Sequence, residues 1–323
     1  MSDTENCLGC YQKLQSERYS GEYHERCSKK LFGMLKPPTI EFGVEEIEEL
    51  AKQSLSQHLA ITGVQPKISL NLQKDGERLS RLTIVGFLGE FILKPPSLSF
   101  PDMAVVEDLS MHLAQLTKIK TAQHGLVRFR SGQFAYIARR FDRIRHRKKL
   151  VKIAVEDFCQ LSGLLTEQKY KTSMEKAGKI ILRYSSNPGL DLSGFFDVTL
   201  FSFLIGNADM YLKNFSLLTN EAGEVGLSPA YDLLSTRLMP IDDSEEMALT
   251  VHGKKSRLTR NDFVAMARSL NIADKVIENS FSRLASAVAE MPTLIQQSFL
   301  PDTLKTDFVE LIHQRAGILG LRR

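Results

Sequence analysis

The spacing of apolar residues divides this chain into a strand-rich first half and a helix-rich second half. Alternation of apolar and polar residues predicts five strands, at 66–72, 78–86, 89–94, 126–130 and 134–141. Helical spacing predicts helices at 44–58 and 104–116, then at 155–163, 172–184, 193–205 and from 261 onward, with one hairpin at 215–234. An α+β fold follows, with a small antiparallel sheet in its first part and mainly helices in its second.

Length and composition are those of a globular chain with more than one domain. With 323 residues, 43% of them hydrophobic and 25% charged, the chain can bury a large core. We predict an N-terminal cap with Cys and His residues at 1–43, a strand-rich lobe at 44–150 and a helical lobe at 151–323. The start is acidic, and no apolar run is long enough to span a membrane, so we expect a cytoplasmic protein.

Positive charge is only slightly in excess, and it clusters at one place. A formal net charge of +4 does not by itself indicate a nucleic-acid partner. The cluster runs from Arg139 to Lys149, and we interpret it as a solvated surface loop. Contact with a phosphate backbone or another acidic partner is the alternative.

Three of the four cysteines lie near the start of the chain, together with a histidine. Cys7 and Cys10 form one closely spaced pair, and His24 and Cys27 form a second pair thirteen residues later. Two such pairs joined by a loop can close a tetrahedron around structural zinc, which a reducing compartment favours over disulfides. Packing of a small cap without metal is the alternative. Cys159 has the spacing of a buried, inert helix residue.

Residues 205–216 read I-G-N-A-D-M-Y-L-K-N-F-S, so an apolar helix runs into several polar side chains. Asp209 and Asn214 stand five positions apart, and Asp232 follows the predicted hairpin. In protein kinases, a base Asp precedes a magnesium-binding Asn by five residues, and a second metal-binding Asp comes later. Each residue alone suits a turn or a cap. The combination predicts phosphoryl transfer in a bilobal, protein-kinase-like fold, with Lys213 offsetting phosphoryl charge.

The strand-rich half is expected to supply the nucleotide contacts. Lys94 ends a strand in F-I-L-K-P-P, and Glu107 opens the nearby helix, as in the ion pair of kinases. A strand-end lysine and a favourable acid in a helix's first turn are the alternatives. The phosphate-covering loop is expected at residues 60–67, including Gly63, Val64, Gln65 and Lys67.

These segments resemble the HipA-type serine/threonine kinase toxins of bacterial toxin–antitoxin systems. The motifs are G-V-Q-P-K (63–67), F-I-L-K-P-P (91–96), R-R-F-D-R (139–143), E-D-F-C-Q-L-S-G (156–163), G-N-A-D-M-Y-L-K-N-F-S (206–216) and P-A-Y-D-L-L-S-T (229–236). The resemblance implies that ATP and Mg²⁺ are the cofactors. It assigns Asp209 as the base, Asn214 and Asp232 to Mg²⁺, Lys94 to the phosphates, Gly63 to Lys67 to the ATP loop, Phe141 to the hinge, and Tyr211 and Tyr231 to the nucleotide site.

The short segment before the ATP loop is similar to the HipT branch of this family. In that branch, a small protein, HipS, replaces a missing N-terminal subdomain and acts as antitoxin beside the DNA-binding HipB. The resemblance therefore implies HipS-like and HipB-like partners. It implies an aminoacyl-tRNA synthetase as the substrate, with translation blocked as the result.

Three positions depart from the family pattern. Tyr211 stands where relatives usually have His, and Arg139 where they often have Glu at the hinge. Ala60 replaces an autophosphorylated Ser, which leaves Thr62, and after it Ser56, as the expected acceptor.

Two other classes of function stay open. A small-molecule phosphotransferase of the aminoglycoside kind also places Asp and Asn five apart, but normally within H-G-D, where this chain has G-N-A-D. A catalytically slow kinase fold that assembles with HipB on operator DNA would use the basic cluster as its phosphate-contacting patch.

Overall fold

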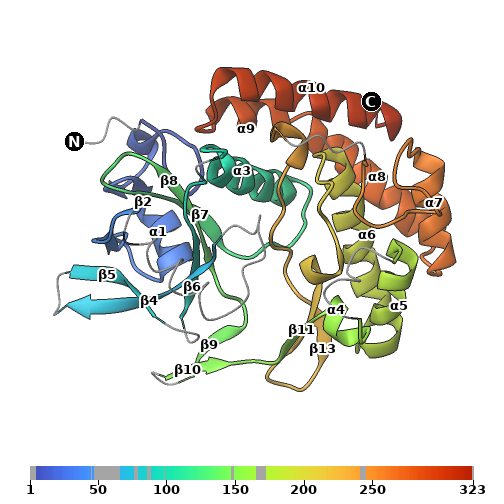
Figure 1. The fold of residues 1–323 in the computed structure, drawn as a ribbon, viewed down its shortest axis with the longest axis horizontal. Helices are drawn as coiled ribbons and strands as arrows, with labels where there is room; N and C mark the ends of the chain where they lie inside the picture. Colours follow the sequence, from blue (N-terminus) through green and yellow to red (C-terminus); the bar gives the residue numbers. More distant parts are fainter. Residues whose placement is uncertain are drawn as a thin grey trace. The chain divides into compact units, whose positions relative to one another are not determined.

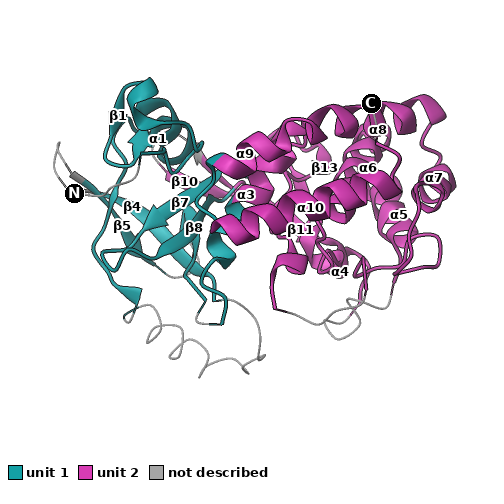
Figure 2. Cartoon of the chain, turned by 90° about the horizontal axis from the view of Figure 1, so that it is seen from above, with its two compact units in different colours: residues 1–108, 122–140, 297–300 teal, residues 109–121, 141–296, 301–323 magenta. Residues whose placement is uncertain are grey.

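The computed structural model describes residues 5–44, 46, 66–75, 79–85, 89–97, 99–146, 149–164, 172–240 and 245–321. The chain forms two compact units (Figure 2). Unit 1 contains residues 1–108, 122–140 and 297–300, and unit 2 contains residues 109–121, 141–296 and 301–323. The N-terminal segment at 1–43 thus shares a unit with the predicted strands.

Unit 1 is built on a six-stranded sheet (Figure 1). Its order is β3 (Thr39–Ile40), β5 (Leu79–Ile84), β4 (Ile68–Asp75), β6 (Phe91–Lys94), β8 (Phe134–Arg139) and β7 (His124–Arg128). All neighbours are antiparallel except the two-residue β3, which pairs parallel to β5. The antiparallel sheet predicted from the alternating pattern is therefore confirmed, with β3 as an addition. Helix α3 (Met103–Leu116) follows β6 in the chain, at the predicted place.

The N-terminal segment folds onto β7. It consists of the 3-10 turn η1 (Leu14–Ser16), the strand pair β1 (Tyr19–Ser20) and β2 (Tyr23–His24), and helix α1 (Glu25–Phe32). The Leu126 amide of β7 donates to the Leu8 carbonyl at 3.2 Å, and the Tyr23 hydroxyl donates to the Leu126 carbonyl at 2.5 Å. A Cβ on Gly125 would lie 2.7 Å from that hydroxyl, so only glycine admits this approach.

Unit 2 contains a hairpin where a loop was predicted. The basic cluster forms β9 (Arg143–His146) and β10 (Lys149–Lys152), so its interpretation as a surface loop was wrong. Ile144 pairs with Val151 across the hairpin. The apolar residues between the charges alternate, and this alternation allows the basic segment to pair as strands.

The rest of unit 2 is mainly helical, with one small sheet. The sheet has the order β11 (Val155–Asp157), β12 (Ser216–Thr219), β13 (Val225–Leu227). The helices are α4 (Phe158–Leu161), α5 (Met174–Tyr184), α6 (Pro188–Leu204), α7 (Arg260–Ser269), α8 (Asp274–Val288), α9 (Met291–Gln297, whose last residue belongs to unit 1) and α10 (Asp302–Ile318). The helix predicted at 155–163 is wrong at its start, because Val155–Asp157 pairs with β12.

The core of unit 2 forms around α6. Four of its phenylalanines, Phe195, Phe196, Phe201 and Phe203, are fully buried. Burial of such side chains contributes about 1.5–3 kcal/mol each, which makes α6 a firm support for the segment that follows it. Over the described ranges, no helix combines the length and the apolar character that crossing a membrane requires.

Two helical glycines of unit 2 lead to opposite predictions. A Cβ on Gly178 in α5 would lie 2.4 Å from Cδ1 of the fully buried Leu270, whereas a Cβ on Gly189 in α6 meets nothing within 4 Å. Gly178→Ala should lower the free energy of unfolding by about 1–3 kcal/mol through overpacking. Gly189→Ala should raise it by up to about 1 kcal/mol through helix propensity. Urea denaturation measures both, and changes of the same sign would contradict this packing.

Candidate active site

The loop that carries Asp209 starts at the end of α6. Gly206 turns the chain at φ 69, and a Cβ there would lie 2.8 Å from Cγ of Arg237, so glycine is required on both counts. The Asn207 side-chain oxygen then accepts a hydrogen bond from the Asp209 amide at 3.2 Å. This turn leaves the Asp209 residue exposed.

Asn214 lies at the end of the short turn η3 (Leu212–Asn214). Its side-chain oxygen accepts a hydrogen bond from the Tyr211 amide at 3.3 Å, and the residue is 9% exposed. A carbonyl oxygen has two lone pairs, so this oxygen can still bind a cation. The backbone bond fixes the orientation of the amide group.

Hydrogen bonds before and after Asp232 connect its segment to the loop of Asp209 and Asn214. Before Asp232, the Tyr231 hydroxyl donates to the Lys213 carbonyl at 2.8 Å. The same hydroxyl oxygen lies 2.6 Å from Ser216 Oγ; because its one proton goes to Lys213, Ser216 is the donor. After Asp232, the Thr236 hydroxyl donates to the Gly206 carbonyl at 3.1 Å and accepts from the Ala208 amide at 2.9 Å.

Asp232 has a left-handed backbone, with φ 55. Such a conformation costs a non-glycine residue about 1–3 kcal/mol and persists only where the surroundings hold it. The hydrogen bonds of Tyr231 and Thr236 supply that constraint. Strained backbone of this kind is concentrated at functional sites.

The charges of this loop region act together on Tyr211. Burial and, after it, the carboxylates of Asp209, Asp232 and Asp157 together raise the pKa of Tyr211 to about 12. Burial also raises the pKa of Tyr231, a hydrogen bond from Ser216 lowers it, and Asp232 and Asp157 raise it. Both aspartates at issue therefore lie close enough to one tyrosine to influence its ionisation.

Asp157 is the acidic residue of this region to which the sequence assigned no role. Its carboxylate accepts from the Gln160 amide at 2.8 Å, and the Gln160 side chain accepts from the Asp157 amide at 3.1 Å, which caps α4. The signal was present in the motif E-D-F-C-Q-L-S-G, in which an Asp precedes a Gln by three positions.

In unit 1, the structure pairs Lys94 with Glu107. Lys94 Nζ lies 2.5 Å from Glu107 Oε1, with 7% and 1% of the side chains exposed. The ammonium also lies 5.4 Å from the centre of the Tyr136 ring. An ion pair this dry must keep its partners together, because either charge alone would be strongly destabilising.

Other residues expected at the nucleotide site are placed as follows. Lys67 is exposed just before β4, whereas Gly63, Val64, Gln65, Thr62 and Ser56 lie outside the described residues. Phe141 packs against Tyr231 within unit 2, with ring centres 5.6 Å apart. Lys213 belongs to η3 and is half-buried.

The basic cluster is partly neutralised. Arg139 pairs with Glu90 at 3.0 Å and Arg143 with Asp142 at 2.5 Å, and the Arg143 side chain is only 3% exposed. Charges held in such pairs are not available for phosphate contacts. This arrangement weakens the interpretation of the cluster as a patch that binds DNA.

The four residues considered for zinc lie together in unit 1. The ligand atoms of Cys7, Cys10, His24 and Cys27 are all within 4.8 Å of one another. Hydrogen bonds from Cys27 and then Cys7 lower the pKa of the Cys10 thiol, and the Cys10 sulfur in turn raises the pKa of the other two thiols. Cys159 is buried and its thiol faces the Leu164 carbonyl at 3.3 Å, as expected for an inert residue.

A cavity of about 430 Å³ lies beside the Asn214 and Ser228–Ala230 segments in unit 2. Asn214 and Phe215, the Ser228–Ala230 segment, and residues of α6 line it, together with Lys118 and Lys120. Asp209 and Asp232 are not among the residues that line it. The cavity therefore adjoins the backbone of the candidate site but is not the site itself.

Comparison with known proteins places this geometry in a family. The family model described as HipA-like C-terminal domain matches residues 59–291, which is more than half of the chain. The chain belongs to the HipA-like C-terminal domain family.

Individual relatives agree with this assignment. A Sinorhizobium fredii protein named "Putative kinase Y4mE" is 32% identical over 240 residues, covering 72% of this chain and 56% of the relative. The serine/threonine-protein kinase toxin HipA of Shewanella oneidensis is 23% identical over 287 residues, covering 79% of this chain and 63% of the toxin. The chain thus spans little more than half the length of the first of these relatives.

One solved structure shows the same fold. It is HipA from Shewanella oneidensis, in a complex of the toxin–antitoxin system HipA and HipB with operator DNA. The TM-score is 0.68 at 19% identity, over 86% of this chain and 71% of the other. The mixed α and β fold of this chain is therefore similar to that of HipA.

Tyr211→Phe should change how stability depends on pH. A tyrosine ionises near pH 10 when unfolded, whereas Tyr211 ionises at about 12 in the folded chain. Its contribution is fully present below pH 10 and is lost as pH rises through this window, because the unfolded chain releases the proton first. Urea unfolding between about pH 9 and pH 12 should show a shallower loss of stability in Tyr211→Phe than in the parent.

The half-exposed Tyr19 offers a matched control for this measurement. Tyr19→Phe should leave the pH dependence of unfolding as it is in the parent. Equal behaviour of the two variants would show that Tyr211 is not placed beside the carboxylates as described.

Proposed function

We propose that this chain is an ATP-dependent protein kinase of serine and threonine with a bilobal, kinase-like fold. The observation that carries the proposal is a pair of hydrogen bonds, from the Tyr231 and Thr236 hydroxyl groups. They hold the segment of Asp232 against the loop of Asp209 and Asn214. Two carboxylates and an amide at this spacing match the parts that phosphoryl transfer requires. Relatives with kinase names support it.

Each residue has a distinct role in the proposal. Asp209, exposed at the end of its turn, orients the attacking hydroxyl and accepts its proton. Lys213 offsets the charge that develops on the transferred phosphoryl group. In unit 1, Lys94 holds the phosphates of ATP while Glu107 fixes its ammonium.

The donor set suits magnesium. Asp232 offers carboxylate oxygens and Asn214 an oriented amide oxygen, and hard oxygen ligands are what Mg²⁺ prefers. When bound there, the ion would neutralise phosphate charge.

We extend the proposal to the biological role as a toxin. The named HipA toxin of Shewanella oneidensis is a relative, and its solved structure contains HipB and operator DNA. By this analogy we propose a HipB-like protein as the partner. From the sequence resemblance to the HipT branch we further propose a HipS-like small antitoxin, and an aminoacyl-tRNA synthetase as the substrate in the cytoplasm. Operator DNA is bound through the partner, since Arg139 and Arg143 are occupied by acids.

Substitution of the catalytic aspartate tests the assignment. Asp209→Asn should lower phosphate transfer from labelled ATP to protein in a bacterial lysate by roughly 10²–10⁴-fold, as loss of a general base does. Asp232→Asn should abolish it through loss of the metal ligand. Both should unfold at nearly the parent's urea concentration, because Asp209 is exposed and Asp232 half-exposed.

Asp302→Asn is a matched control, because that carboxylate is 95% exposed on α10 and pairs only with Lys305 at 3.1 Å in the contacts seen. It should transfer phosphate like the parent. Undiminished labelling by Asp209→Asn would refute the assignment of the base. Label found only in small molecules, with none in protein, would favour the small-molecule phosphotransferase instead.

A further inference from the structure

We propose that Cys7, Cys10, His24 and Cys27 bind one zinc ion, which fixes the N-terminal loop that supports the start of helix α3. Three thiol sulfurs and one imidazole nitrogen lie within 4.8 Å of one another. Zinc takes such ligands in a tetrahedron, at about 2.3 Å for sulfur and about 2.0 Å for nitrogen. Ligand atoms around one ion are then roughly 3.5–3.8 Å apart, so only a small contraction closes the site.

The histidine is held in the form that binds metal. The Lys13 carbonyl lies 3.1 Å from His24 Nε2, and a carbonyl only accepts, so Nε2 carries the proton of the neutral ring. This leaves the lone pair on Nδ1, which lies 3.3 Å from Cys10 Sγ. A backbone carbonyl on the second nitrogen is the usual way in which a metal-binding histidine is oriented.

Two backbone amides around the Cys7 sulfur would stabilise a thiolate there. It accepts hydrogen bonds from the Gly9 amide at 3.4 Å and the His24 amide at 3.3 Å. Donors of this kind stabilise a thiolate that ligates metal. A Cβ on Gly9 would lie 2.8 Å from the Tyr23 ring and 3.0 Å from Cys27 Cβ, so glycine allows the two ligand pairs to meet.

A disulfide accounts less well for the cluster. None of the four cysteines forms a disulfide in the structure. A disulfide between two of the three thiols would not explain why the third thiol and an oriented imidazole lie at the same place. One tetrahedral ion uses all four groups at once.

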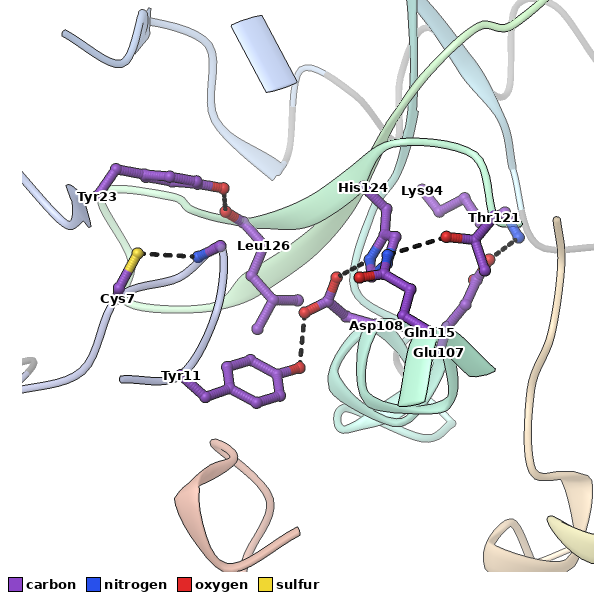
Figure 3. A network of polar contacts seen from close by, with 11 residues as sticks. Cys7, Tyr11, Tyr23, Lys94, Glu107, Asp108, Gln115, Thr121, His124 and Leu126 are labelled. Atoms are coloured by element: carbon purple, nitrogen blue, oxygen red, sulfur yellow. Dashed lines mark hydrogen bonds and ion pairs between the residues drawn. The ribbon is translucent and has the colours of Figure 1, made fainter. Parts of the chain in front are cut away.

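The residue after Cys10 connects this cluster to helix α3. Tyr11 has a left-handed backbone, at φ 64, and its hydroxyl donates to Asp108 Oδ2 at 2.6 Å. The other oxygen of Asp108 lies 2.6 Å from His124 Nδ1 of β7 (Figure 3). Both side chains point at this one carboxylate, which is fully buried.

Asp108 is adjacent to Glu107, the partner of Lys94 (Figure 3). Tyr11 directly follows the loop that runs from Cys7 to Cys10. Its left-handed backbone and its buried hydrogen bond to Asp108 therefore depend on the conformation of that loop. An ion that fixes this loop therefore also fixes the position of the helix segment that carries Glu107.

Metal analysis tests the first half of the proposal. Protein prepared without an affinity tag or added metal, in a reducing buffer, should contain about one zinc per chain by elemental mass spectrometry. Cys10→Ser should lose most of it, while Cys159→Ser, which alters the one cysteine outside the cluster, should keep it. An intact-mass measurement that finds no metal in the parent, or a disulfide within the cluster, would overturn the proposal.

A second measurement covers the case in which Cys10→Ser does not fold. Removing the metal from the parent with a zinc chelator should increase amide hydrogen exchange in residues 5–32 and in the first turns of α3. Exchange that stays unchanged in both segments would show that no ion supports them.

Tyr11→Phe separates the metal from its effect on α3. This variant should keep one zinc per chain, because Tyr11 is not a ligand, yet amides near Asp108 should exchange roughly tenfold faster, as loss of one hydrogen bond to a charged group allows. Tyr19→Phe, in the same segment but half-exposed, should leave exchange unchanged. Equal exchange in Tyr11→Phe and the parent would contradict the coupling. None of these three experiments involves ATP, so all are independent of the proposed function.

Discussion

The candidate active site depends on two hydroxyl groups that hold one strained aspartate. Asp232 follows β13 in a left-handed conformation, with φ 55. The Tyr231 and Thr236 hydroxyl groups donate to the carbonyls of Lys213 and Gly206, which holds the segment of Asp232 against the loop that carries Asp209 and Asn214. The buried phenylalanines of α6 make the start of this loop rigid. If these side chains were mobile, ordering them for each reaction would cost conformational entropy, and a loop that is already fixed avoids that cost.

Unit 1 holds its charges by burying them in pairs. Lys94 and Glu107 form one pair, and Asp108 with Tyr11 and His124 forms a second polar cluster one residue further along α3. A buried charge without its partner is strongly destabilising. The main effect of these contacts is therefore to favour one position of helix α3, and their net contribution to stability is small. The N-terminal segment, which carries the four proposed zinc ligands, helps to fix helix α3 through the hydrogen bond from Tyr11 to Asp108.

Much of the fold could be read from the sequence where the apolar period is long. Five of the six strands of the large sheet and the helices α3, α5 and α6 lie close to their predicted positions. Short strands escaped prediction because their stability comes from distant partners: β11 pairs with β12 about sixty residues later, and β3 has only two residues. The basic hairpin escaped for the opposite reason, since dense charge concealed a short alternation around Ile144 and Val151.

The site shows the same limit. A fixed spacing along the chain predicts a joint role for Asp209, Asn214 and Asp232, because local turns and a hairpin set their separation. The contacts of Tyr231 with Lys213 and of Thr236 with Gly206 join residues 18 and 30 positions apart, and no pattern in the sequence indicates them. The capping signal of Asp157 was present in the sequence, but the proximity of its carboxylate to Tyr211 follows only from the structure.

The division of labour between base and metal ligands is the central claim. Manganese binding in the presence of a nonhydrolysable ATP analogue, followed by electron paramagnetic resonance, tests it directly. The account predicts that Asp232→Asn and Asn214→Ala weaken manganese binding at least tenfold, whereas Asp209→Asn binds the ion like the parent. Weaker binding in Asp209→Asn alone, or equal binding in all three variants, would contradict it.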